Sequence, residues 1–244
     1  MKIIYILLYI CILFTSCSED TNSSPENAYH INAYFFRYMD YPEGTSQSMT
    51  YDDNLAKINY DNSYKILKRI GGFRAIDQAT GSSYFFSSDI YDTITYSQNQ
   101  ILVKQKLNST IFHVPLFERK LILNNQGKVI KKLIYREYFD LPIVDTVYYS
   151  YNSLGNLMET RKGKVEHITE SSKYYFNENK NLDSIVTKKY YLEYLEQKTV
   201  EIFSDFDNAN NPLKNLFIFE ETFNRSLSKN NYRKYEIKKY RDTN

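Results

Sequence analysis

The sequence predicts an all-β fold, an antiparallel meander of successive hairpins that curls into a single-sheet half-barrel or barrel. Three observations predict it. The residue pattern has a period of two, as where Tyr235 and Ile237 alternate with Lys234, Glu236 and Lys238, which is the periodicity of a strand. The 25 Tyr and 15 Phe favour a pleated, half-buried surface. Short turns that begin with Asn or Asp recur along the chain, with room for two strands between them.

The first sixteen residues are interpreted as a signal peptide and not as part of this fold. Lys2 supplies one positive charge, and residues 3–14 are an unbroken apolar run. A membrane-spanning helix needs about 20 apolar residues, so this run is too short to span but suits a secretory signal. Thr15 and Ser16 are small residues of the kind that precede a cleavage site, and Cys17 follows them.

The segment ending at Cys17 resembles the lipobox of bacterial lipoproteins, with Phe14 where leucine is usual. The resemblance implies that Cys17 carries fatty-acyl chains such as palmitate, and several chains anchor a protein more firmly than one. An ordinary cleaved signal with a chance cysteine is the alternative. Cys11 would leave with the signal, so the remaining chain is expected to have no disulfide and no cysteine-ligated metal.

Ser18, Glu19 and Asp20 resemble the export signal that sends Bacteroidota-type lipoproteins to the outer face of the outer membrane. The resemblance implies an outer-membrane protein anchored by lipid and displayed on the cell surface. A chance acidic pair in a polar tether is the alternative. Residues 18–27 contain no apolar side chain, so residues 17–27 are expected to form a flexible tether and residues 28–244 a single β-meander domain.

The predicted hairpins depend on the chemistry of their turns. An Asn or Asp at the start of a turn can hydrogen-bond to the backbone two residues on, and Gly can adopt a positive φ. Where Lys180 stands in place of Gly, Asn179 or Asn181 is expected to take the left-handed conformation. No amphipathic helix is identified. The residues assigned to turns are Gly127, Asn152, Gly155, Asp207, Asn211 and Pro212.

These hairpins resemble the YD repeat of RHS proteins and, more closely, domains of unknown function in Bacteroidota-type outer-membrane lipoproteins. That family implies a curled, mostly single-sheet β fold and no catalytic residues. Several copies in this chain lack the glycine, and no regular YD period is present. The matching residues are Tyr149, Tyr151, Asn152, Gly155 and Leu157 in one hairpin, and Asp207, Asn211 and Pro212 before the last strand.

The charge distribution singles out the C-terminus. The whole chain has a formal charge of +2, a weak field that does not by itself point to a polyanionic partner, and no nucleic-acid-binding pattern is found. Residues 225–244, however, carry seven basic and two acidic side chains. A solvated edge strand at residues 231–241 explains this excess, and a site for lipid head groups or acidic glycans is the alternative.

No catalytic, metal or cofactor site is predicted. His30 and His113 are interpreted as structural. Glu166 and Glu170 lie near His167, but successive residues of a strand point to opposite faces. His167 is one residue from Glu166 and three from Glu170, so it points away from both and the three cannot share a metal. Residues 207–211 resemble a calcium loop but lack its Gly and further acidic ligands. Paired carboxylates such as Glu220 and Glu221 are interpreted as charged strand faces.

Three functions follow from these patterns. The first is a non-enzymatic binding or structural module displayed on the outer membrane, with a glycan, lipid or protein as its ligand. The second is a periplasm-facing carrier of lipid or another hydrophobic ligand, held on the concave face of the sheet. The third is a surface hydrolase, which would need carboxylates or a His converging in a cleft.

Overall fold

The computed structural model describes residues 31–36, 39–40, 49–50, 54–78, 81–108, 117–138, 141–164 and 167–241. The predicted signal peptide, Cys17, the export signal at Ser18, Glu19 and Asp20, and the predicted tether lie outside the described residues. His30 and His113 also lie outside them.

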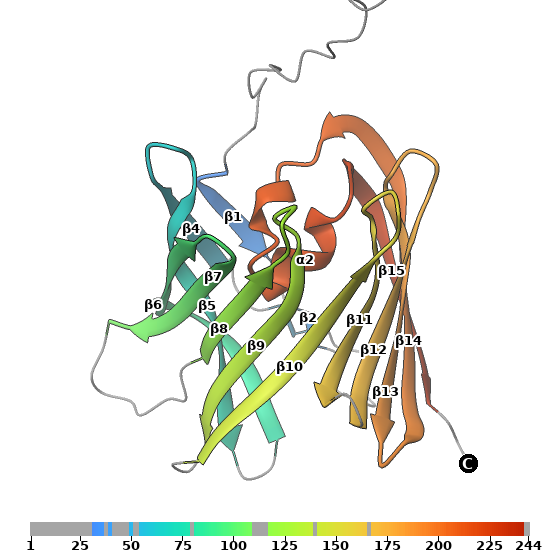
Figure 1. Ribbon diagram of the computed structural model, residues 1–244, viewed down its shortest axis with the longest axis horizontal. Coiled ribbons are helices and arrows are strands. Elements are labelled where there is room, and N and C mark those ends of the chain that lie inside the picture. Colours follow the sequence, from blue (N-terminus) through green and yellow to red (C-terminus); the bar gives the residue numbers. More distant parts are fainter. Residues whose placement is uncertain are drawn as a thin grey trace, which may run out of the picture.

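The predicted fold class is confirmed. A single 13-stranded antiparallel sheet follows the order of the chain, and it is curled but open, with β1 and β15 at its two edges (Figure 1). A separate two-stranded sheet pairs β2 (Met39–Asp40) with β3 (Met49–Thr50). The strands of the large sheet are β1 (Ala33–Phe36), β4 (Asn54–Tyr60), β5 (Ile66–Gln78), β6 (Gly81–Ser97), β7 (Gln100–Leu107), β8 (Phe117–Leu123), β9 (Val129–Tyr138), β10 (Leu141–Tyr151), β11 (Leu157–Lys164), β12 (His167–Phe176), β13 (Leu182–Tyr191), β14 (Tyr194–Asn210) and β15 (Asn230–Arg241).

Four hairpin turns share one pattern of hydrogen bonds. In the β8–β9 turn, Asn124 Oδ1 accepts hydrogen bonds from the backbone N–H groups of Gln126 and Lys128, at 3.0 and 2.9 Å. The residue three positions after the opening Asn or Asp has a positive φ in every copy, because this conformation brings the chain back into register. These residues are Tyr64 (59°), Gly127 (74°), Lys180 (62°) and Gly155 (80°).

The expectation for the turn without glycine was wrong. Lys180 itself adopts the left-handed conformation, and neither Asn179 nor Asn181 does. Asn177 explains this result, because its Oδ1 accepts hydrogen bonds from the backbone N–H groups of both Asn179 and Asn181, each at 3.1 Å. The side chain of the first residue therefore determines which position turns left-handed, even where a β-carbon makes that conformation costly.

Replacing Gly155 with valine is expected to lower the free energy of unfolding by about 1 kcal/mol or more, because a β-branched residue is strained at a φ of 80°. Chemical denaturation followed by circular dichroism would measure the change. As a matched control, Lys180→Gly removes a side chain from the same position of another turn and is expected to raise stability. An unchanged midpoint for Gly155→Val would contradict the assigned conformation.

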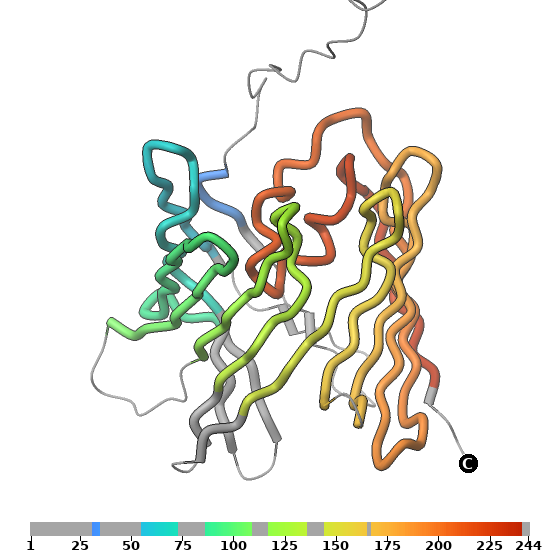
Figure 2. The backbone as a smooth tube through the Cα atoms, in the orientation of Figure 1, coloured from blue at the N-terminus to red at the C-terminus, as the bar shows by residue number. Residues whose placement is uncertain are grey.

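The concave side of the sheet is filled by the chain itself. Between β14 and β15, residues 211–229 form an insertion that contains η1 (Lys214–Leu216) and α2 (Glu220–Ser226). Figures 1 and 2 show this insertion lying inside the curve of the sheet, between its two halves. The sequence interpretation, which identified no amphipathic helix, was wrong here. The spacing of Leu216, Phe219, Phe223 and Leu227, at three or four residues, is the signal that could have revealed it.

The predicted last turn opens this insertion and does not lead directly into the last strand. Asp207 lies within β14, contrary to its assignment to a turn, whereas Asn211 and Pro212 follow the end of that strand. Asn211 Nδ2 donates hydrogen bonds to the carbonyl oxygens of Arg225 (2.6 Å) and Ser228 (2.9 Å). The buried Asn211 side chain thereby ties the beginning of the insertion to its end.

Two hydrophobic clusters hold the insertion against the sheet. In the first, Leu216 and Phe219 pack on side chains of the N-terminal strands, such as Ile94 and Val103. In the second, Phe223 and Leu227 pack on side chains of the C-terminal strands, such as Leu182, Ile185 and Phe203. An open meander cannot bury its own concave face, so the insertion supplies the missing apolar layer.

The helices in the described part of the chain are all too short or too polar to cross a lipid bilayer.

Candidate functional site

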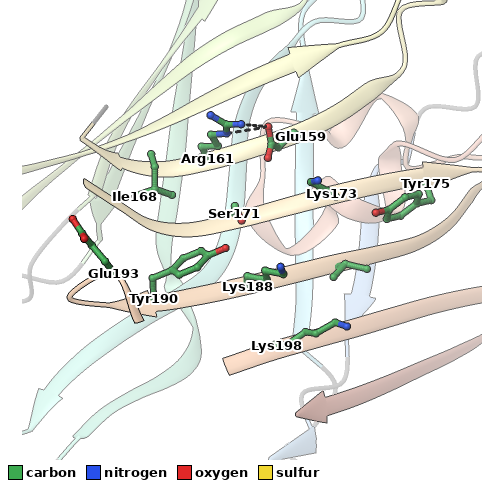
Figure 3. A pocket seen from close by; sticks show the side chains of 11 residues that line it. Glu159, Arg161, Ile168, Ser171, Lys173, Tyr175, Lys188, Tyr190, Glu193 and Lys198 are labelled. Carbon is green, nitrogen blue, oxygen red and sulfur yellow. Dashed lines mark hydrogen bonds and ion pairs between the residues drawn. The ribbon is translucent and has the colours of Figure 1, made fainter. Parts of the chain in front are cut away.

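A hollow of about 640 Å³ lies on the outer face of β11–β14 (Figure 3). Strand alternation explains its position. Tyr174 points to the concave side, where its ring contacts that of Phe223 of the insertion with centroids 6.5 Å apart. Its neighbours Lys173 and Tyr175 therefore point outward, into the hollow. The site uses the face of the sheet that the insertion does not cover.

Lysines on three successive strands dominate this hollow. Lys173, Lys188 and Lys198 come from β12, β13 and β14 and line it together (Figure 3). Lys188 lies directly opposite Lys198 in the β13–β14 register. Like charges in this position repel each other and destabilise the pairing of the strands.

These lysines differ from the arginine beside them. Arg161 forms an ion pair with Glu159, with Nη2 and Oε2 2.9 Å apart. Among the described residues, no carboxylate lies within ion-pair distance of Lys173, Lys188 or Lys198. The hollow therefore presents positive charge that the described part of the protein does not neutralise.

The tip of the β13–β14 hairpin forms one end of the hollow, through Tyr190 and Glu193. Leu192 and Glu193 have φ values of 47° and 74°, a tight-turn conformation that usually takes Asn and Gly. Tyr191 and Tyr194 beside them are 69% and 80% exposed. Backbone strain and exposed aromatic side chains at one tip are features that concentrate at binding sites.

A second cluster of charges is buried under the insertion. Asp92 is fully buried, and its Oδ2 accepts from Arg69 Nη2 at 2.5 Å and from Arg119 Nη2 at 3.1 Å. Arg69 also pairs with Glu221 of α2, and its guanidinium lies 4.4 Å from the centroid of the Phe219 ring. The cluster joins the insertion to β5, β6 and β8. Sequence reasoning missed it because its members are far apart in the chain and carry no motif.

The sequence interpretation placed Glu220 and Glu221 on a strand, and this was wrong. The two residues begin α2. Lys132 Nζ lies 3.1 Å from Glu220 Oε1, and its positive charge lowers the pKa of Glu220 to about 2. The stabilisation from this pair is present above a pH of about 4.5 and is lost as the pH falls toward 2. Solvent screening keeps it weak, because the Glu220 side chain is 57% exposed.

The fold is expected to lose stability above pH 10. Burial raises the pKa of Tyr34, Tyr96 and Tyr151 to about 12 each. A raised pKa means that the neutral phenol favours the folded state, so its contribution is complete below pH 10 and is lost as the pH rises toward 12. For the buried Tyr34, two pKa units correspond to roughly 2 to 3 kcal/mol. Parallel measurements of phenolate absorbance and circular dichroism would test this, and a melting temperature constant from pH 9 to 12 would contradict it.

The residues singled out for metal chemistry do not converge. His167 opens β12, and its Nδ1 lies 4.0 Å from Glu193 Oε1 at the hairpin tip. In the described part of the chain, no three His, Cys, Asp or Glu side chains are grouped so that they could hold a metal ion. Asp207 is engaged in structural hydrogen bonds, with Oδ1 accepting from the Ala209 N–H and Oδ2 from Asn231 Nδ2.

The geometry defines a class of protein, an open curled β-sheet with its concave side occupied by its own insertion and a basic hollow on its outer face. In comparisons with known proteins, no family model and no curated protein matches the sequence.

Proposed function

We propose that the protein is a lipid-anchored, non-enzymatic binding module of the cell envelope, displayed on the outer membrane. The N-terminal pattern around Cys17 supports the anchor, and Ser18, Glu19 and Asp20 support surface display. One structural observation carries the binding role: Lys173, Lys188 and Lys198 share a solvent-facing hollow, and none of the three forms an ion pair with a carboxylate among the described residues.

The alternative of a lipid or hydrophobic-ligand carrier requires an apolar cavity on the concave face. In the described structure Leu216 and Phe219 occupy this face, each at most 1% exposed. The buried charges of Arg69, Asp92 and Arg119 lie on the same side of the sheet. Both features favour a packed interior over a lipid-binding one, so the outer face is the better candidate for the ligand.

The anchor is tested by replacing Cys17 with alanine. Wild-type protein is expected in the membrane fraction, extracted only by detergent, and labelled when cells are fed a radioactive fatty acid. The Cys17→Ala protein is expected to lose the label and to leave the membrane fraction. Ser16→Ala, a change between two small residues beside the cysteine, is the matched control and is expected to behave as wild type. A Cys17→Ala protein that still requires detergent would contradict the anchor.

Protease treatment of intact cells tests surface display. Cleavage of the protein on intact cells, with a periplasmic marker protected, is the expected result. Protection until lysis would place the domain in the periplasm and would favour the carrier function instead.

A further inference from the structure

Two lysines of the hollow, Lys188 and Lys198, belong to a longer row of side chains that crosses the sheet from β9 to β15. Each member lies directly opposite the next in the strand register, so all share the outer face. Neighbouring strands are about 4.8 Å apart, so the row extends for roughly 29 Å. We call it the cross-strand row. Its members are Lys131, Tyr148, Arg161, Ser171, Lys188, Lys198 and Tyr240.

The row next to it adds further positive charge. Lys173 lies opposite Val186 in the β12–β13 register, and Lys238 lies opposite Val200 in the β14–β15 register. Glu159, opposite Lys173, is the acidic member of this second row and is paired with Arg161. Together the two rows place cations on six strands, along a line perpendicular to the strands.

We propose that the cross-strand row binds an acidic polysaccharide, with the sugar chain running across the strands of the outer face. This inference rests on the proposed function, and it names the ligand class of that same face. A line of cations is complementary to a linear polymer that carries carboxylate or sulfate groups at regular intervals. Lysine suits such a ligand because it is a flexible point charge that imposes no fixed geometry on the anion.

The tyrosines of the row favour a polysaccharide over a nucleic acid. Proteins that bind single strands stack bases on open aromatic rings. Here Lys131 Nζ lies over the Tyr148 ring and Lys198 Nζ over the Tyr240 ring, each 5.6 Å from the centroid. These lysines cover one face of each ring and place positive charge where a base would stack.

The shape of the sheet favours a chain over a membrane surface. Strands β9 to β15, which carry the cross-strand row, follow one another in the curled sheet (Figure 1), and the row lies on their outer face. A flexible polymer can follow this curvature along the whole row, whereas a flat bilayer could contact only part of it.

Lys188 and Lys198, which lie opposite each other, allow a substitution that tests the proposal in a protein that still folds. Lys188 and Lys198 repel each other in the free protein, and an anionic ligand between them would relieve that repulsion. Lys188→Glu replaces the repulsion with an attraction to Lys198. We therefore expect this variant to unfold at a higher temperature and yet to bind the ligand more weakly.

The experiment uses the full-length protein in a neutral detergent and fluorescently labelled polygalacturonate, with binding measured by fluorescence anisotropy. Saturable binding is expected, weaker at higher salt because salt screens the charges, and unaffected by neutral dextran. Lys188→Glu is expected to weaken binding at least tenfold. Lys106→Glu, the same charge change at an exposed position of β7 outside the row, is the matched control and is expected to bind as wild type.

Three results would overturn the proposal. The first is no binding of polygalacturonate or of heparin, a sulfated polysaccharide. The second is equal weakening by Lys188→Glu and Lys106→Glu, which would show that net charge alone matters. The third is tighter binding to an oligonucleotide or to vesicles of phosphatidylglycerol than to either polysaccharide. If the Cys17 label and surface cleavage are found but polysaccharide binding is not, the ligand class fails while the proposed anchor and display stand.

Discussion

Replacing Asp92 with alanine is expected to lower the free energy of unfolding by about 3 to 5 kcal/mol, which is a large part of the stability of an ordinary domain. Asp92 is the carboxylate between Arg69 and Arg119, and the three side chains are at most 7% exposed. Its removal would leave two buried guanidinium groups without their shared partner. Urea denaturation followed by circular dichroism would give the change directly.

A surface ion pair provides the matched control for Asp92. Lys104 and Glu118 lie on the neighbouring strands β7 and β8, 3.0 Å apart, with side chains 49% and 39% exposed. Glu118→Ala removes a carboxylate from an ion pair between strands, as Asp92→Ala does, but in solvent, so a change below about 1 kcal/mol is expected. Equal effects of the two substitutions would mean that burial of the Asp92 cluster does not matter.

Phe219→Ala is the second substitution with a large expected effect, again about 3 to 5 kcal/mol. The Phe219 side chain is fully buried between η1 and α2, and it packs into the cluster formed by the N-terminal strands. Its removal would leave a cavity at the point where the insertion meets the sheet. A weaker aromatic signal in near-ultraviolet circular dichroism, with a lower unfolding midpoint, is the expected observation.

Tyr194→Ala is the matched control, because Tyr194 is an aromatic residue that is 80% exposed, and its substitution is expected to change stability by less than about 0.5 kcal/mol.

A double-mutant cycle tests whether Phe219 and Asp92 belong to one cluster. Phe219 and Asp92 both contact Arg69, so the effects of Phe219→Ala and Asp92→Ala are expected to be non-additive. Strict additivity would contradict a shared cluster beneath the insertion.

The outer-face site could be predicted only in part. The individual lysines are visible in the sequence, but the alternation along β12, β13 and β14 does not give the register between strands. Lys188 and Lys198 are ten positions apart. They lie opposite each other because the hairpin turns at Leu192 and Glu193 and the register then shifts by one residue between Lys189 and Tyr190. A shift of one residue would move one of them to the concave face.

The interior, too, could be predicted only in part. The helix of the insertion could not be predicted from the sequence, because the Asn, Pro and acidic residues of this segment also suit a loop. A seven-residue helix also has little stability of its own. Its helical form depends on contacts of Phe219 and Phe223 with opposite halves of the sheet. Local preferences carry no information about such contacts, because the partners come from strands far away in the chain.

The sequence by itself determined the all-β class, the order of the hairpins and the chemistry of their turns, because alternation and Asn-led turns are local properties of the chain. Only the tertiary structure decided three other features: the filling of the concave side by residues 211–229, the burial of Asp92 between two arginines, and the alignment of basic side chains from six strands. Each depends on the register and curvature of the whole sheet, which arise when distant strands pair and the exposed apolar face is buried.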